Sequence, residues 1–314
     1  MEMNVDYLVI GGGLSGLICA RQLSRKFGPE NVLVVEKGSP VSAEKKHSGA
    51  AFFAHRHMDE ITDPHPVKTV WTIRGWWGTE KNAVRAYRKK IWNDFIGPEV
   101  SISEGVHNGY EINYERLINT ARILNNCEVK SVCVDKKRMV ETNLGTIIVN
   151  RAIIITVPLF AWAKWFPEFP DSPEFDYSYK PIYLYDGKGI DQMNGNMVPG
   201  DKTIHMAYYP SYEDDWYRVT VSGSGVVAES LQNTIRLTSG SSTWNISPFG
   251  RKVPGKIHPL FGDCQAQFDI FKNKAINMDV YFIGRYAKWI PKYYIHDSYE
   301  DVNNLIDLRL WRMR

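Results

Sequence analysis

The sequence lacks the features that mark a membrane protein or a secreted protein. No apolar run in its 314 residues approaches the roughly 18 residues that a membrane-spanning helix needs. Glu2 and Asp6 stand where a signal peptide carries its basic region, so we expect no signal peptide. The four cysteines show no C-x-x-C spacing, which excludes a disulfide-rich scaffold and predicts reduced thiols in a cytoplasmic protein.

The composition also lacks a dominant charge. Lysine and arginine number 38 against 35 aspartates and glutamates, so the net charge of +3 gives no overall indication of nucleic acid binding. A hydrophobic share of 44% with 23% charged residues excludes a disordered or fibrous chain and fits two closely packed domains. Aromatic residues are plentiful, with 10 Trp and 17 Tyr, which either wall a planar ligand or fill an ordinary core.

The most informative pattern lies near the N-terminus. A short apolar strand, Tyr7–Ile10, runs directly into Gly11, Gly13 and Gly16, which fit G-x-G-x-x-G and open a helix. The first glycine permits a tight turn, the second lets backbone approach a pyrophosphate, and the third lets the helix pack on the strand. The next apolar strand ends at Glu36, where a carboxylate binds ribose hydroxyls. The pattern predicts dinucleotide binding; the alternative is a βαβ unit whose glycines serve packing alone.

Basic residues follow this unit. His55, Arg56 and His57 are adjacent and lack the i, i+4 spacing that would let them converge on zinc, so we expect no metal. Arg56 is better placed near an anionic cofactor or substrate.

The stretch 71–92 interleaves aromatic residues with arginine and lysine. We expect a helix at residues 80–95, with Arg85, Arg88, Lys89 and Lys90 beside its apolar stripe. An amphipathic helix with a solvated basic face is one interpretation. A stacking surface for a nucleotide sugar or a nucleic acid base is the other.

The middle of the chain is predicted to contain one more helix and then mostly strands. The helix is expected from Gly109, with Leu117, Ala121 and Leu124 on its inner face. A hairpin and an Ile-rich strand follow, and Pro158 ends that strand because proline cannot continue it.

Residues 160–260 predict an antiparallel sheet. Its expected strands are Ile182–Tyr185, His205–Tyr209 and Trp216–Ser222. The segment Lys252–Leu260 is expected to be a proline-bounded loop that carries Lys256 and His258.

The C-terminal region predicts a second strand–glycine–helix unit. A strand at Val280–Ile283 stops at Gly284 and Arg285, and a helix is expected to open at Asp297 or Ser298. A second unit of this kind argues against a plain NAD dehydrogenase.

Three stretches together resemble the FAD-dependent amine oxidase superfamily, including its UDP-galactopyranose mutase branch: Gly11–Glu36, Ala152–Pro158, and Tyr281–Tyr286 with the following helix. The resemblance implies FAD as cofactor and an α/β, Rossmann-type (GR2-like) FAD-binding domain beside a second, mainly antiparallel β substrate domain. The FAD-binding domain would span residues 1–60, 110–160 and 275–314, and the substrate domain residues 61–109 and 161–274. The short chain suits a compact bacteriophage-encoded member in the host cytoplasm.

The resemblance also implies site residues. The helix near Ser298 would direct its N-terminus at the flavin. The residues expected at the cofactor are Gly11, Gly13, Leu14, Ser15, Gly16, Glu36, Lys37, Arg56, Pro158, Gly284, Arg285 and Ser298. The catalytic candidates are Lys256, His258 and Tyr293. The chain departs from the family after Glu36, where a second glycine-rich arginine motif is poorly matched, and it has no clear match to the lysine that many amine oxidases place near flavin N5.

The leading hypothesis is oxidation of an amine-bearing substrate, in which hydride passes to flavin N5, the imine hydrolyses and the C–N bond breaks. One alternative is a lyase acting on an amino-acid-modified thymidine in phage DNA hypermodification, with stretch 71–92 contacting DNA. Another is a non-redox sugar mutase, whose diphosphate would need Arg74, Arg218, Arg236 or Arg285. A third is a cofactor-binding module without turnover. The expected partner is a small or nucleotide-bearing molecule, no membrane is expected, and the oligomeric state stays open.

Overall fold

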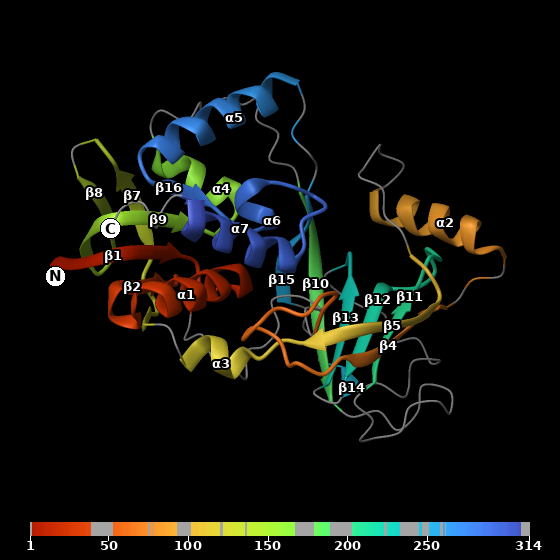
Figure 1. Cartoon of the computed structure of the whole chain (residues 1–314). Coiled ribbons are helices and arrows are strands. Elements are labelled where there is room, and N and C mark those ends of the chain that lie inside the picture. The colour runs from red at the N-terminus through yellow and green to blue at the C-terminus, as the bar shows by residue number, and fades with distance from the viewer. Residues whose placement is uncertain are drawn as a thin grey trace.

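The computed structural model describes residues 2–38, 53–74, 76, 78–92, 102–119, 122–135, 137–166, 179–188, 203–222, 225–232, 245–246, 251–257, 260 and 262–308. These residues form two β-sheets with associated helices, one at the left and the other at the right of Figure 1. None of the described helices is long and apolar enough to cross a lipid bilayer.

The first sheet is parallel at its centre and antiparallel at one end. The parallel strands are β6 (Arg122–Leu124), β2 (Val32–Val35), β1 (Glu2–Ile10), β9 (Gly145–Ile155) and β16 (Val280–Phe282). The hairpin strands β8 (Arg138–Thr142) and β7 (Val129–Cys133) extend it beyond the first half of β9.

Apolar residues cover both faces of this sheet. In β1, Leu8 and Ile10 enter the core on one face, and Tyr7 and Val9 enter the core on the other. A strand that is buried on both faces has no reason to alternate polar and apolar residues, which explains the continuous apolar run that predicted it.

Helices lie on both faces. On one face, α1 (Leu14–Phe27) packs beside α7 (Ile295–Leu308). The other face is covered by α4 (Leu159–Trp162) and α5 (Gly262–Asn277), whose rings Trp162 and Phe271 stack at 5.6 Å. Helix α5 is not among the elements predicted from the sequence, since the predicted sheet region ends at residue 260 and the next predicted element is the strand at Val280–Ile283.

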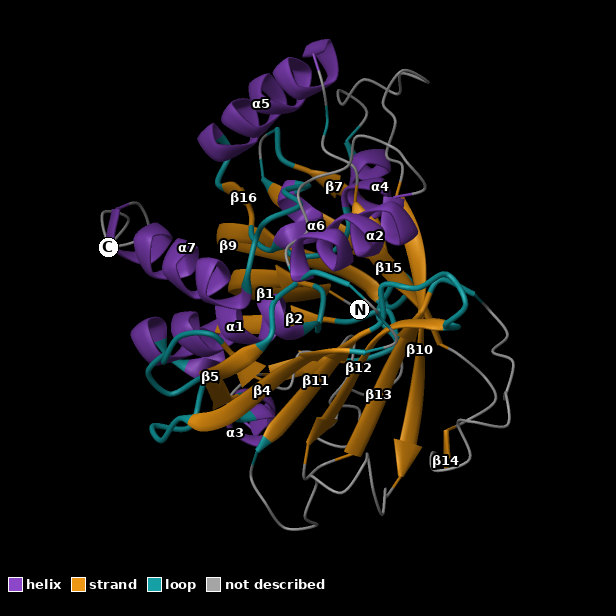
Figure 2. Cartoon of the chain, turned by 90° about the vertical axis from the view of Figure 1, so that its right-hand side faces the viewer, coloured by secondary structure: helices purple, strands orange, loops and turns teal. Residues whose placement is uncertain are grey.

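The second sheet fans out below the first in Figure 2. Its strands are β14 (Asn245–Ile246), β10 (Tyr179–Lys188), β13 (Gly225–Ser230), β12 (Trp216–Ser222), β11 (Ile204–Tyr208), β4 (Val67–Ile73), β5 (Gly105–Glu111) and β3 (Phe53–Ala54), in that order, with β15 (Arg251–Ile257) also paired to β10. All pairs are antiparallel except β4 with β11. Helix α2 (Glu80–Trp92) packs Tyr87 against Tyr208 and Tyr217 of this sheet.

Both the fold class and the mainly antiparallel second sheet are confirmed. The chain passes between the sheets four times, because β1 and β2 precede β3–β5, β6–β9 precede β10–β15, and β16 comes last. The predicted domain boundaries themselves stay a prediction.

The structure corrects two predicted elements in the middle of the chain. The helix expected from Gly109 is only α3 (Tyr114–Asn119), and Leu124 lies instead in β6, an edge strand beside β2. The proline-bounded loop after Lys252 is instead the strand β15, in which Pro254 faces Pro181 at a shift in register. Both prolines are tolerated because this pairing lies at the sheet edge and at an irregularity, where a ladder hydrogen bond is dispensable.

Candidate cofactor and substrate site

The glycine turn joins the end of β1 to the start of α1. Gly11 has a φ of +110°, a backbone conformation that favours glycine. A Cβ atom on Gly16 would lie 1.9 Å from the carbonyl oxygen of Gly11, so no side chain fits there. The Thr156 hydroxyl, at the end of β9, donates to the carbonyl oxygen of Ile10 at 2.9 Å and closes the turn from the other side. The packing of the protein itself therefore requires glycine at positions 11 and 16.

Gly13 differs from the other two glycines. A Cβ atom on Gly13 would have no described atom within 4 Å, so the protein's own packing leaves this space open. Gly13 is the N-cap residue of α1. The first turn of this helix carries no acidic residue and receives no hydrogen bond from a described capping side chain. The free N–H groups and the positive dipole end of a helix attract anions. The space over Gly13 thus fits the pyrophosphate of a dinucleotide.

Glu36 lies at the end of β2, directly beside this turn. Its carboxylate accepts a hydrogen bond from the Gly12 N–H at 2.6 Å and another from the Gly38 N–H at 2.7 Å. These bonds hold the carboxylate next to the phosphate position, where a ribose hydroxyl can reach it.

Three predicted residues from distant parts of the sequence converge at the start of α1. The hydroxyl oxygens of Ser15 and Ser298 are 3.0 Å apart. Gly284 has a φ of +100°, and a Cβ atom on it would lie 2.8 Å from the Ser15 hydroxyl oxygen. The turn after β16 and the first part of α7 therefore pack directly against the glycine turn.

The start of α7 corrects a sequence prediction. The helix begins at Ile295 rather than at Asp297 or Ser298. The Asp297 carboxylate accepts from the Tyr294 N–H at 2.6 Å, as the third residue of a capping box does. Ser298 lies inside the first turn and is buried, so it contacts Ser15 instead of capping the helix.

The other residues predicted at the cofactor have protein partners or flank the turn. The Lys37 ammonium lies 2.6 Å from Glu128, and the Arg56 guanidinium lies 3.3 Å from Glu300, in two exposed ion pairs. Arg285 donates from Nε to the carbonyl oxygen of Tyr293 at 3.1 Å. Leu14 opens α1, and Pro158 precedes α4.

Of the three predicted catalytic residues, the structure describes the side chain of Tyr293. Tyr293 is buried, and its hydroxyl donates to Asp301, which also pairs with Lys288. Burial and the Asp301 carboxylate raise the pKa of Tyr293 far above its usual range, so this phenol keeps its proton. Lys256 belongs to β15, opposite Lys180, and His258 lies outside the described residues.

The family model of the FAD-dependent oxidoreductases (DAO) matches residues 6–100, which include the glycine turn and Glu36. Over these residues the chain is similar to the FAD-dependent oxidoreductases. The match confirms the predicted enzyme class and the predicted FAD cofactor, whereas a phage origin stays a prediction.

Several solved structures share the fold of this oxidoreductase. A reduced UDP-galactopyranose mutase is 13% identical, with a TM-score of 0.67 over 98% of this chain and 94% of that chain. A CLA-producing fatty acid isomerase from P. acnes is 9% identical, with a TM-score of 0.56 over 97% and 98% of the two chains. An L-proline dehydrogenase from P. horikoshii is 14% identical, with a TM-score of 0.51 over 98% and 94%. At these identities the likeness concerns the fold alone. No curated protein has a sequence that matches the chain.

On the second sheet, the oxidoreductase brings rings together beside the start of α7. We call His55, Trp71, His107, Tyr294 and His296 the aromatic–histidine cluster. His55 meets Trp71 at 5.8 Å and Tyr294 at 5.9 Å, both edge-on, while His107 lies 4.5 Å from Trp71. Tyr294 stacks on His296 at 5.4 Å. The cluster therefore combines the residue after β3, one residue each of β4 and β5, and two residues at the start of α7.

The cluster is open to solvent and holds polar atoms that a ligand can use. His55, His107 and Tyr294 are exposed, whereas the Trp71 indole N–H is buried and has no hydrogen-bond partner among the described residues. Desolvation by the surrounding rings lowers the pKa of His55, and the positive charges of His296 and Arg218 lower it further. His55 is therefore neutral at neutral pH.

A buried ion pair of the oxidoreductase lies near this cluster. The Arg218 guanidinium of β12 binds Glu229 of β13 through two hydrogen bonds, one of which is 2.7 Å long. Burial alone would lower the pKa of Arg218, but the Glu229 carboxylate raises it well above its usual value, so the pair stays charged. Glu229 is only 2% exposed, so Arg218 is its essential counter-charge.

Helix α2 changes the interpretation of stretch 71–92. Lys90, predicted on the basic face, is buried. Its ammonium nitrogen lies 2.5 to 3.0 Å from four carbonyl oxygens, those of Tyr209, Ser211, Asp214 and Trp216, which share its three N–H donors. Tyr87 and Trp92 are buried as well. DNA binding by this stretch stays a prediction, and it would depend on exposed residues such as Arg85 and Lys89.

Sequence reasoning did not find the aromatic–histidine cluster, the Arg218–Glu229 pair or the buried role of Lys90. The cluster residues are scattered from position 55 to position 296. Pairing of β3, β4 and β5 brings three of them together, and ring contacts add the two at the start of α7. The abundance of aromatic residues was the one signal in the sequence, and it did not indicate which rings meet.

Proposed function

We propose that this oxidoreductase oxidises the C–N bond of an amine-bearing substrate that lies against the aromatic–histidine cluster. The observation that carries the proposal is the position of the cluster, next to the first turn of α7, whose Ser298 contacts the glycine turn through Ser15. The aromatic faces of Trp71 and Tyr294 favour an apolar or cationic substrate group over a diphosphate.

Bound FAD supplies the acceptor for the hydride that leaves the carbon next to nitrogen, so two electrons pass to the cofactor while a C=N bond forms. The amine must first lose its ammonium proton, because the nitrogen lone pair forms the new bond. Neutral His55 can accept that proton, and Trp71 and Tyr294 orient the imidazole from two sides. Water then adds to the C=N bond, and the carbonyl product separates from the amine.

The arginines expected for a mutase diphosphate support the amine hypothesis better than the mutase hypothesis. Arg218 is neutralised by Glu229, and Arg285 donates to a main-chain carbonyl. The Nε atom of Arg74 is buried without a hydrogen-bond partner among the described residues, so it remains the arginine that an anionic substrate group could use. Arg236 lies outside the described residues.

The test is anaerobic mixing of the FAD-loaded protein with a panel of amines and, separately, with UDP-galactose. We expect an amine to bleach the flavin absorption, and His55→Gln to slow the bleaching by about 10²-fold, a typical effect of removing a general base. His65→Gln, another exposed histidine, is the matched control and should bleach at the normal rate. A protein that no amine reduces, but that isomerises the sugar nucleotide after chemical reduction, would contradict the proposal and favour the mutase alternative.

A further inference from the structure

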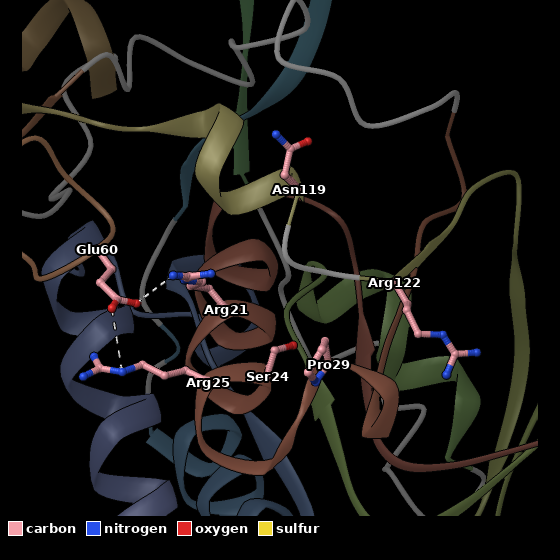
Figure 3. A pocket seen from close by; sticks show the side chains of 7 residues that line it. All are labelled: Arg21, Ser24, Arg25, Pro29, Glu60, Asn119 and Arg122. Carbon is pink, nitrogen blue, oxygen red and sulfur yellow. Dashed lines mark hydrogen bonds and ion pairs between the residues drawn. The ribbon is translucent and has the colours of Figure 1, made fainter.

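A pocket lies beside α1, which contributes Arg21, Ser24 and Arg25 to its lining (Figure 3). It has a volume of about 380 Å³, within the range of small-molecule sites. Its lining residues are Arg21, Ser24, Arg25, Pro29, Glu60, Asn119 and Arg122. Neither the proposed oxidation nor the FAD contacts use any of them.

The pocket has more positive charge than its own carboxylate can neutralise. Arg21 lies 2.8 Å from Glu60, and Arg25 lies 3.9 Å from the same carboxylate. On the other side of the pocket, Arg122 donates to the main-chain carbonyl of Glu30 at 2.8 Å, and no carboxylate of the described residues forms an ion pair with it. Three guanidinium groups against one carboxylate leave a net charge of +2 on the lining side chains.

Two buried polar atoms at this pocket have no hydrogen-bond partner in the part of the chain that the structure describes. The Ser24 hydroxyl belongs to a residue that is only 6% exposed, and neither it nor the Arg21 Nε has a hydrogen-bond partner among the described residues. A helical serine usually satisfies its hydroxyl on the preceding turn, and a buried polar atom without a partner is costly. The packing of α1 explains the Arg21–Glu60 pair. It does not explain why the Ser24 hydroxyl and the Arg21 Nε are buried without a described partner.

We propose that this pocket binds a small phosphate monoester, such as a sugar phosphate or a nucleoside monophosphate. A dianionic phosphate matches the net charge of +2 and accepts hydrogen bonds from Ser24, Arg21 and Arg122. Glu60 and Asn119 remain as hydrogen-bond partners for the hydroxyls of the sugar.

The test uses the FAD-loaded protein, so that the phosphate position over Gly13 is already filled. Isothermal titration with AMP, with ribose 5-phosphate and with inorganic phosphate should show that both esters bind, and that adenosine and ribose do not. We expect Ser24→Ala and Arg122→Gln each to weaken binding of the esters by about tenfold or more, as loss of a charge-assisted hydrogen bond does. Arg85→Gln, an exposed arginine on α2, is the matched control and should bind normally.

Flavin content and the rate of flavin bleaching by an amine should be unchanged in Ser24→Ala, which shows that the variant is folded. Because the pocket does not depend on the proposed oxidation, loss of one proposal leaves the other intact. Equal binding of AMP by the wild type, Ser24→Ala and Arg122→Gln would overturn the phosphate site. Binding of inorganic phosphate alone, or of a single-stranded oligonucleotide without a terminal phosphate in preference to the esters, would overturn it as well.

Discussion

The two sheets of this oxidoreductase bury different kinds of side chain. In the first sheet, β1, β2 and β9 fill both faces with residues such as Leu8, Val34 and Ile154. In the second region the core also contains Glu229 of β13 and Lys90 of the overlying α2, each held by a partner on another strand or loop. The first sheet therefore depends on close apolar packing around a turn. The second region depends in addition on buried charged groups, each of which needs a polar partner. The following variants test that difference.

The largest effect is expected at the glycine turn. In Gly16→Ala the new methyl group would meet the Gly11 carbonyl oxygen at 1.9 Å, and backbone cannot move aside as a flexible side chain can. We expect a loss of stability of at least ~3 kcal/mol, at the upper end for an overpacked site. Urea denaturation monitored by tryptophan fluorescence measures it; a variant of wild-type stability would show that the turn is not tightly packed.

In the second region, Glu229→Gln should have an effect of similar size for another reason. The change leaves the Arg218 charge buried without its carboxylate, which costs about 3–5 kcal/mol. The double variant Arg218→Met with Glu229→Leu should regain much of that loss, because an apolar pair needs no counter-charge. Chemical denaturation of the wild type, of Glu229→Gln and of the double variant measures the three free energies of unfolding. A double variant no more stable than the single one would contradict the explanation.

Gly13→Ala should separate cofactor binding from folding. Its backbone φ of −70° suits alanine, and no described atom lies within 4 Å of the added Cβ atom, so stability should change by less than about 1 kcal/mol. The methyl group would occupy the space assigned to the pyrophosphate, and FAD affinity should fall by at least about tenfold. Titration of the apoprotein with FAD measures this, and unchanged affinity would remove Gly13 from the cofactor site.

The pH dependence of amine oxidation should identify His55. Its pKa is lowered below 6.5, so the neutral ring that accepts a proton is present above that pKa and is lost as the pH falls through it. We expect kcat/KM to decline on the acid side with a midpoint below 6.5, and His55→Gln to remove this decline. A decline that persists in His55→Gln would assign the titration to another group.

The smallest effect is expected at an ion pair in the first region. Asp6 lies 3.2 Å from Arg151 and also accepts from Asn150, and both charged side chains are about one-third exposed. Water screens such a pair, so Asp6→Asn should cost no more than about 1 kcal/mol. Thermal melts of this variant beside Glu229→Gln compare a solvated pair with a buried one directly.

The difference between the sheets also explains which parts could be predicted from the sequence. Gly11, Gly13, Gly16 and Glu36 lie within 26 residues of one another and encode their turn locally, so dinucleotide binding could be predicted from them. Pro254 of β15 suggested a loop, because only the structure shows that it faces Pro181 of β10 at a sheet edge.

The sequence context of a charged residue also led to a wrong prediction. Lys90 has the sequence context of a solvated helix face, and nothing in that context shows that the carbonyls of a later loop surround it. The site on the second sheet depends on such distant contacts, because the tertiary fold places the His55 ring 5.9 Å from the Tyr294 ring. Amphipathic periodicity describes one element at a time and carries no information about these partners.

The interleaving of the two sheets along the chain imposes an order on synthesis. When β4 leaves the ribosome, its parallel neighbour β11 is still more than a hundred residues away, and four strands of the other sheet must be made first. The first sheet, in turn, receives β16 only near the end of translation. The second sheet has all its strands once β15 is made, whereas the first sheet still lacks β16. The nascent protein therefore presents unpaired strand edges for much of its synthesis, and exposed edges of this kind favour aggregation. No contiguous piece of the chain contains all the strands of one sheet without strands of the other.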